Sequence, residues 1–176
     1  MSRIANVRFA RVDQFEYRLC KLANATAQRR LVRAFFRVIS RLGDGPLWAG
    51  LILFQPIWLG QQGYGASLRM AIAGIFGLSI YKTLKKYLVR ERPYIGLVGI
   101  ECAMPPLDRY SFPSGHTLHA VMFAAMLAHY IPTLAPMLIA LAVLIAASRV
   151  VLGLHYPTDV IVGASIGYTI ARIALP

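Results

Sequence analysis

The chain has 176 residues, of which 57% are hydrophobic and 15% are charged, and its formal net charge is +12. Soluble globular domains contain about 25% charged residues, so this composition argues against an ordinary soluble domain. The basic residues are segregated and the rest of the chain consists of long charge-free runs, which favours a membrane protein over a nucleic-acid-binding protein. We therefore expect no nucleic-acid partner.

Residues 1–42 form a basic region of their own. Apolar residues recur at helical spacing from Phe9 to Leu22, and an arginine recurs every four residues from Arg29 to Arg41. This pattern predicts one or two amphipathic helices that lie on an anionic leaflet and contact membrane lipids. The alternative is a plain basic flank that sets the topology. Residues 43–176 are expected to form the membrane-embedded domain.

Five apolar segments follow within that domain. They span residues 47–63, 66–88, 115–131, 134–152 and 157–175. The run from Tyr110 up to, but not including, Arg149 has no Asp, Glu, Lys or Arg. It is too long for one crossing of about 20 residues, and Pro132 and Pro136 divide it. The predicted fold class is an all-α integral membrane protein with about five transmembrane helices plus an N-terminal amphipathic surface helix region.

The positive charge indicates how the chain sits in the membrane. With five crossings, the N-terminus, the 82–115 loop and the 149–157 connection lie on the same side of the membrane. This side holds all of the 19 lysines and arginines except Arg69 and Arg172. The positive-inside rule then places this side at the cytoplasmic face of a multi-pass protein in the bacterial inner (plasma) membrane. A hidden crossing within residues 1–42 would invert the assignment.

Three short polar strings border the apolar segments on this basic side. They are Lys85-x6-Arg92-Pro93, Pro113-Ser114-Gly115-His116 and Ser148-Arg149-x5-His155-x3-Asp159. Lys85, Arg92 and Arg149 are suited to clamp phosphoryl oxygens, because arginine binds two oxygens with its rigid fork and lysine acts as a point charge. Ser114 and Gly115 open a predicted helix, whose free N–H groups form a ready anion site.

The histidines supply the reactive groups. His155 is the expected nucleophile, because Asp159 lies one turn further on and can accept one imidazole N–H, which frees the other nitrogen for attack. His116 is the expected general acid and, later, the base that activates water. The chain has seven acidic residues, and they do not cluster as magnesium ligands would, so we expect no metal and no cofactor.

The three strings resemble the signature of the type 2 phosphatidic acid phosphatase family, which shares its site with vanadium haloperoxidases. The resemblance covers residues 85–159 and every signature position. It implies a helical membrane fold, no metal requirement and a phosphohistidine intermediate. It also implies roles for eight residues: phosphate binding by Lys85, Arg92, Ser114, Gly115 and Arg149, acid–base catalysis by His116, nucleophilic attack by His155 and orientation of His155 by Asp159. Many membrane members of the family have six spans and a periplasmic site, whereas five spans and a surface helix are predicted here.

The predicted function is that of a membrane lipid phosphatase acting on the phosphate or diphosphate of a lipid. Phosphatidic acid, phosphatidylglycerophosphate and polyprenyl phosphates are candidate substrates. The alternative is an undecaprenyl diphosphate phosphatase or a lipid phosphotransferase whose site faces the periplasm. Five apolar spans argue against a haloperoxidase, and the intact nucleophile and acid argue against a non-catalytic lipid-binding protein.

Overall fold

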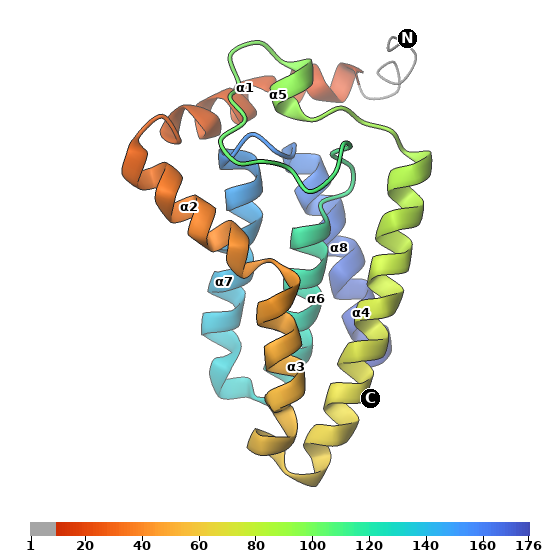
Figure 1. Ribbon diagram of the computed structural model, residues 1–176. Helices are drawn as coiled ribbons and strands as arrows, with labels where there is room; N and C mark the ends of the chain where they lie inside the picture. The colour runs from red at the N-terminus through yellow and green to blue at the C-terminus, as the bar shows by residue number, and fades with distance from the viewer. Residues whose placement is uncertain (1–9) are drawn as a thin grey trace.

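The computed structural model describes residues 10–176, and most of these residues are helical. In chain order the helices are α1 (Ala10–Thr26), α2 (Arg30–Leu42), α3 (Gly45–Leu59), α4 (Gln61–Tyr87), α5 (Pro93–Gly96), α6 (Gly115–Tyr130), the 3-10 turn η1 (Pro132–Leu134), α7 (Ala135–Val151) and α8 (Pro157–Ala174) (Figure 1). No strand occurs within these residues, so the predicted all-α class is confirmed there. The prediction for Phe9 falls outside the described residues.

Five of the helices run side by side as a bundle. Helices α3, α4, α6, α7 and α8 lie along one direction, with α6 packed against α4, α7 and α8 (Figure 1). The inward residues of α6, which include Leu118, Met122 and Met126, are fully buried. Such burial of apolar side chains on all sides of α6 makes it the central helix of the bundle.

The five predicted spans correspond to these five helices, but the helices differ in how well they fit a membrane. Two segments are both long and apolar enough to cross, the 27-residue α4 and the 20-residue stretch Pro132–Val151. Helix α3 has 15 residues and ends before residue 63, because Gly60 has a φ of +58° and cannot continue a right-handed helix. The count of five crossings therefore stays a prediction.

Close contact between α6 and α8 depends on two glycines of α8. A Cβ atom on Gly163 would lie 2.6 Å from the carbonyl oxygen of Ser114, and one on Gly167 would lie 2.2 Å from that of Leu118. Neither distance is compatible with a side chain. The stripe of small residues therefore sets the separation of these helices, as it commonly does in membrane proteins.

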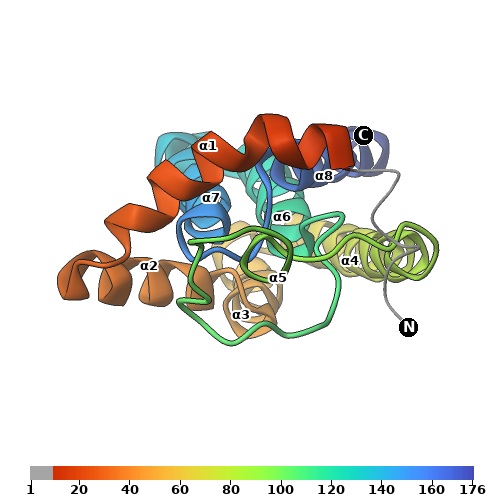
Figure 2. The same ribbon diagram turned by 90° about the horizontal axis from the view of Figure 1, so that it is seen from above.

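The N-terminal region forms two helices that cross one end of the bundle (Figure 2). Helix α2 packs on α7 and buries Ile39 and Ser40. Two arginines of the predicted stripe bind backbone, since Nε of Arg33 donates to the carbonyl of Ala27 at 2.7 Å and Nε of Arg37 donates to that of Ala103 at 2.6 Å. The predicted helices are confirmed from residue 10 onward, and part of the arginine stripe fastens α2 to its neighbours.

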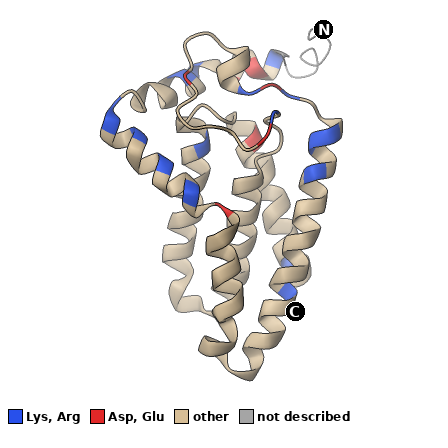
Figure 3. Cartoon of the chain, in the orientation of Figure 1, with Lys and Arg blue, Asp and Glu red and all other residues tan. Residues whose placement is uncertain are grey.

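Basic residues gather at the same end of the bundle as α1, α2 and the loop between α4 and α6 (Figure 3). The short connection between α7 and α8 also lies there (Figure 1). All three polar strings therefore meet at one end of the molecule, as the alternation of the predicted spans requires.

Candidate active site

The three predicted phosphate-binding cations come from three different elements and are all buried. Lys85 lies in the last turn of α4, Arg149 in the last turn of α7, and Arg92 directly precedes α5. Lys85 is 8% exposed, Arg149 is 2% exposed and Arg92 is 1% exposed. Buried cations are retained in proteins only where they meet anions or strong acceptors. The partners of these side chains therefore indicate what the site is built to hold.

Lys85 and Arg92 converge on a single carboxylate, that of Asp108. Nη2 of Arg92 donates to Oδ1 of Asp108 at 2.7 Å, and Nζ of Lys85 binds the same oxygen. Nζ of Lys85 also donates to the carbonyl of Tyr110 at 2.6 Å, and Nη1 of Arg92 donates to that of Leu154 at 2.7 Å. Two of the three cations are thus held within bonding distance of one anionic group.

Arg149 reaches the same region from α7 and is less completely paired. Its Nη1 donates to Oγ of Ser40 on α2. Its Nε is buried and has no hydrogen-bond partner within the described residues. A buried guanidinium N–H without an acceptor costs free energy, so this N–H is well suited to donate a hydrogen bond to an anionic oxygen of a ligand.

His155 lies in the connection between α7 and α8 and is 2% exposed. Its Nε2 is 3.3 Å from Nη1 of Arg92, and its Nδ1 is 3.5 Å from Oδ2 of Asp159. Burial lowers the pKa of the His155 imidazole well below its ordinary value, and the positive charges of Arg92, Arg149 and Lys85 lower it further. The ring is therefore neutral, with one nitrogen toward the cations and the other toward a carboxylate.

The connection that carries His155 is fixed by backbone geometry and by α1. Gly153 has a φ of +74°, which a glycine adopts readily, and a Cβ atom there would lie 2.5 Å from the carbonyl oxygen of Glu101. Nδ2 of Asn24 on α1 donates to the carbonyls of Glu101 and Val151 at 3.0 Å each. The turn before His155 is thus held between α1 and the 97–114 loop.

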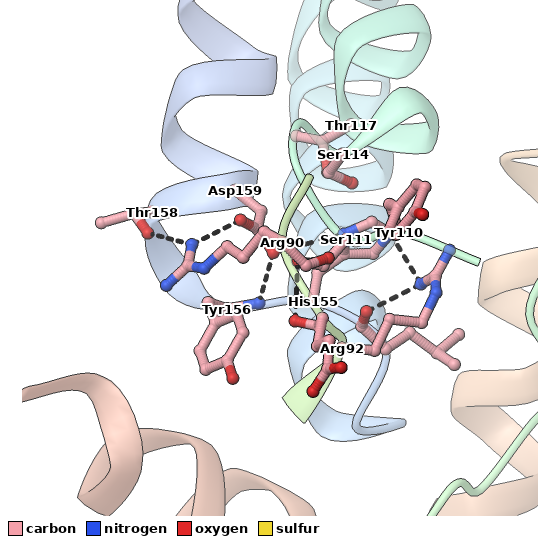
Figure 4. Close-up of polar contacts among 12 residues, drawn as sticks. Arg90, Arg92, Tyr110, Ser111, Ser114, Thr117, His155, Tyr156, Thr158 and Asp159 are labelled. Carbon is pink, nitrogen blue, oxygen red and sulfur yellow. Dashed lines mark hydrogen bonds and ion pairs between the residues drawn. The ribbon is translucent and has the colours of Figure 1, made fainter. Parts of the chain in front are cut away.

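Asp159 is fully buried in the first turn of α8 and is held from several sides (Figure 4). Its Oδ2 accepts a hydrogen bond from the backbone N–H of Tyr156 at 2.8 Å, and its Oδ1 accepts one from Nη1 of Arg90 at 2.5 Å. Its backbone carbonyl accepts the N–H of Ser114 at 3.0 Å, which joins the start of α8 to the start of α6.

The start of α6 carries the predicted acid, His116. Nε2 of His116 is 2.8 Å from Oδ1 of Asp44, the residue that precedes α3. A Cβ atom on Gly115 would lie 2.6 Å from the ring of Tyr81, so glycine is required for the approach of α4. Oγ of Ser114 lies 3.0 Å from Oγ1 of Thr117, and the N–H of Ser114 is taken by Asp159. The predicted binding of phosphate by Ser114 and Gly115 stays a prediction.

A largely apolar cavity of about 640 Å³ opens beside His116. It lies between α3, α4 and α6, and its lining includes Trp48, Ile52, Ile75, Leu78, His119 and Phe123. His119 is held within it, since its Nδ1 lies 2.9 Å from the carbonyl oxygen of Gly115. The cavity thus places apolar surface directly next to a polar, cationic centre.

The structure brings all the predicted catalytic and cationic residues to one end of the bundle, together with Asp108, whose place before the Pro-Ser-Gly-His string makes it a candidate for a headgroup pocket. It adds two residues that the sequence did not single out. Asp44 lies in a turn before the first span, and Arg90 lies in the loop between the second and third spans. The only local feature of the sequence that points to Arg90 is its position two residues before Arg92. Within residues 10–176, no group of three or more His, Cys, Asp or Glu side chains is arranged to hold a metal ion.

Comparisons with known proteins show the family to which the chain is related. Residues 65–176 match the family described as the PAP2 superfamily. The chain is 35% identical over 148 residues to the decaprenylphosphoryl-5-phosphoribose phosphatase of Mycolicibacterium smegmatis, covering 79% of this chain and 75% of that protein. It is similar to the crystal structure of Aquifex aeolicus LpxE, with a TM-score of 0.80, 29% identity and coverage of 91% and 94% of the two chains. It is also similar to a transmembrane PAP2 type phosphatidylglycerolphosphate phosphatase from Bacillus subtilis, with a TM-score of 0.76, 25% identity and coverage of 93% and 84%.

Proposed function

This chain belongs to the PAP2 superfamily, and we propose that it is a membrane phosphatase that hydrolyses a lipid phosphate or diphosphate through a phosphohistidine at His155. The observation that carries the proposal is the placement of His155. Its Nε2 lies 3.3 Å from Arg92 and its Nδ1 lies 3.5 Å from Asp159. This orientation keeps the proton on Nδ1 and directs the lone pair of Nε2 toward the cations that would hold phosphate.

In the first step, Nε2 of His155 attacks phosphorus and the bond from phosphorus to the lipid oxygen breaks. The equatorial oxygens are held by Lys85, Arg92 and Arg149, which stabilise the charge that spreads over them. His116 donates a proton to the leaving lipid oxygen. Asp44, 2.8 Å from Nε2 of His116, favours the protonated form that this donation needs.

In the second step, water replaces the lipid. His116, now neutral, takes a proton from a water molecule, whose oxygen attacks phosphorus as the bond to Nε2 of His155 breaks. Inorganic phosphate is released, and His155 returns to its neutral form with Asp159 still beside Nδ1. The same two side chains therefore serve both steps, and all of the groups named belong to this chain.

The cavity beside His116 supports a lipid as the substrate. Its apolar lining between α3, α4 and α6 suits an acyl or polyprenyl chain, while the phosphate would lie among the cations above it. The relatives are named as phosphatases of a decaprenylphosphoryl sugar and of phosphatidylglycerolphosphate. Phosphatidic acid, phosphatidylglycerophosphate and polyprenyl phosphates are therefore the substrates to compare.

The same proposal places all five bundle helices across the membrane. Helices α3, α6 and α8 are shorter or less apolar than α4 and α7, but they lie in the same bundle and expose large apolar side chains such as Leu53, Ile57 and Ile161. The end that carries the site is also the basic end, which favours the cytoplasmic face of the inner membrane.

Helices α1 and α2 would then rest on the surface of the anionic leaflet. Phe15 on α1 and Leu31 on α2 are 82% and 84% exposed, and Arg29 and Arg30, which directly precede Leu31, are exposed as well. Exposed apolar and basic side chains on one surface helix are typical of contact with anionic lipids. Reconstitution into nanodiscs with and without anionic lipid should show higher activity with it, and Arg30→Gln should reduce that difference.

The function is tested by assaying phosphate release from a panel of lipid phosphates in EDTA, with wild type and His155→Ala side by side. Wild type should release phosphate, orthovanadate should inhibit it, and His155→Ala should be inactive. Activity that EDTA abolishes and magnesium restores would contradict the mechanism. Transfer of the phosphate to an added lipid alcohol in place of water would instead identify a phosphotransferase.

The side of the membrane is tested with a cysteine that the chain already contains. Cys102 is exposed in the loop at the site end, whereas Cys20 is buried. Cys102 of intact cells should not react with an impermeant thiol reagent and should react after permeabilisation, with Cys102→Ser as the control. Ready labelling of intact cells would place the site in the periplasm and favour the undecaprenyl diphosphate phosphatase or phosphotransferase alternative.

A further inference from the structure

Behind His155, on the side away from the cations, the Arg90 guanidinium is bound by the carboxylates of Asp159, Glu16 and Asp13. Figure 4 shows the first of these contacts, to Asp159, beside the contact of Arg90 with Thr158. Nη1 donates to Asp159 at 2.5 Å and Nη2 donates to Glu16 at 2.8 Å. Nη2 and Nε also donate to Asp13 at 2.6 and 2.9 Å. Arg90 is 1% exposed, and the face of its guanidinium lies 3.8 Å from the ring centre of Tyr156.

Two of these carboxylates belong to α1, far from Asp159 in the sequence. Glu16 is 3% exposed and also binds the start of α8 directly. Its Oε1 accepts the backbone N–H of Thr158 at 2.6 Å, and its Oε2 accepts the hydroxyl of Thr158 at 2.8 Å. A carboxylate is favourable at a helix N-terminus, where N–H groups have no partner within the helix. Glu16 therefore fixes the turn that carries Asp159.

The number of carboxylates around Arg90 matters for the charge at His155. Arg90 paired with Asp159 alone would form a neutral pair, which has little power to favour positive charge on a neighbouring imidazole. Glu16 and Asp13 share the same guanidinium, so the group carries an excess of negative charge whenever at least two of its three carboxylates are ionised. Burial raises the pKa of Asp13, and its hydrogen bonds with Arg90 lower it. The imidazole ring gains positive charge when Nε2 bonds to phosphorus, and this excess lies on the side of Nδ1 where it stabilises that charge.

We propose that Glu16, assisted by Asp13, is a positioning residue for the reaction: helix α1 acts through Arg90 to hold Asp159 beside His155 and to keep that side of the site anionic. The residues of α1 precede the segment 65–176 that matches the family. On this proposal the N-terminal helix is part of the catalytic apparatus as well as a contact with the membrane surface. The inference rests on the proposed function.

The test compares Glu16→Gln with Glu101→Gln in full-length protein. Glu101 is a matched control, because its carboxylate is 63% exposed and its ion pair with Arg33 is 3.5 Å long. Glu16→Gln should lower kcat about tenfold, which is the effect typical of losing a partner that orients a reactive histidine. The rate of phosphoenzyme formation in a single turnover should fall by the same factor as kcat. KM and the inhibition constant of inorganic phosphate should stay within about twofold of wild type, and Glu101→Gln should match wild type throughout.

An unchanged kcat in Glu16→Gln would overturn the proposal, and so would a parallel loss of kcat and phosphate affinity, which indicates a general loss of structure. Asp13→Asn removes one charge while leaving the bonds from Glu16 to Thr158 in place, and it should lower kcat in the same direction by a smaller factor. If Glu16→Gln is not recovered from membranes, Asp13→Asn decides, and a wild-type kcat there overturns the proposal. Failure of wild type to act on any lipid phosphate would instead contradict the proposed function.

Discussion

Asp108 lies against Arg92 inside the proposed phosphate site, with its Oδ1 2.7 Å from Nη2 of the guanidinium. Lys85 and Tyr81 bind the same carboxylate. Burial alone would raise the pKa of Asp108, but the hydrogen bonds from Lys85 and Tyr81 and the charge of Arg92 lower it to about 2. Asp108 is therefore ionised at any working pH, and a substrate phosphate must compete with it for two of the three cations.

The first prediction concerns the removal of this competitor. Asp108→Asn should bind inorganic phosphate about fivefold more tightly, because a charge interaction with a partly exposed carboxylate such as Asp108 contributes about 1 kcal/mol. The inhibition constant of phosphate against lipid phosphate hydrolysis measures the change, with Glu101→Gln as the control. Weaker inhibition in Asp108→Asn would show that the carboxylate builds the site and does not compete for it.

The second prediction concerns Asp44, which lies 2.8 Å from His116. Asp44→Asn removes the negative charge that favours protonated His116, so protonation of the leaving lipid oxygen should become limiting. We expect a loss of about tenfold or more in kcat with a lipid phosphate, at the low end of the contribution of a general acid. An aryl phosphate such as p-nitrophenyl phosphate has a leaving group that needs no proton, and its kcat should fall much less. Equal losses with both substrates would contradict the role of His116 as the acid.

The proposed reactive residues could be singled out from the sequence because the features that suggest them are local. His155, Pro157 and Asp159 lie within one turn of a helix start, and a proline at the first helical position is a strong signal. The bounds of α6, α7 and α8 were also predicted to within about two residues, because proline, glycine and charge mark them clearly. The bounds of these helices follow from the length of each apolar segment and from the residues that begin and end a helix.

The residues that the sequence did not reveal act across long separations. Asp44 pairs with a histidine 72 positions away, and Glu16 binds Thr158 across 142 positions. An isolated carboxylate before a helix, or on an amphipathic helix, gives no indication of its distant partner. The length of α3 was overestimated for a different reason, because the charge-free run continues beyond Gly60, where the backbone conformation ends the helix.

The third prediction follows from the neutral state of His155. Unfolded histidine titrates near pH 6.5, whereas burial and the cations Arg92, Arg149 and Lys85 hold the pKa of folded His155 well below that value. Below pH 6.5 the unfolded state therefore binds a proton that the folded state does not, so stability falls as pH falls, by about 1.4 kcal/mol per pH unit from this group.

This contribution is isolated by comparing wild type with His155→Gln in detergent. Both proteins should lose apparent melting temperature from pH 6.5 to 5, and wild type should lose more, by the equivalent of about 2 kcal/mol. An identical pH dependence in the two proteins would show that His155 is not held neutral.

The last prediction connects helix packing to the site. A Cβ atom on Gly163 would lie 2.6 Å from the carbonyl oxygen of Ser114, one turn after Asp159 on α8. Backbone cannot yield as a flexible side chain does, so Gly163→Ala should push the start of α8 away from the start of α6. Overpacking of this kind costs about 1–3 kcal/mol. Because Asp159 and Ser114 are joined at this contact by a hydrogen bond of 3.0 Å, kcat should fall together with the melting temperature.

Two further glycines distinguish this effect from a general loss of stability. Gly167→Ala meets the carbonyl oxygen of Leu118 at 2.2 Å but lies one turn further from the site, so it should lower the melting temperature at least as much and kcat less. Gly50 lies in α3 with no atom within 4 Å of a Cβ, and Gly50→Ala should leave both quantities unchanged. If Gly163→Ala and Gly167→Ala reduce kcat equally at equal stability, the contact between Ser114 and α8 does not position Asp159. A larger loss of kcat in Gly163→Ala supports that role, because only this variant forces apart the two helix starts that hold His116 and Asp159.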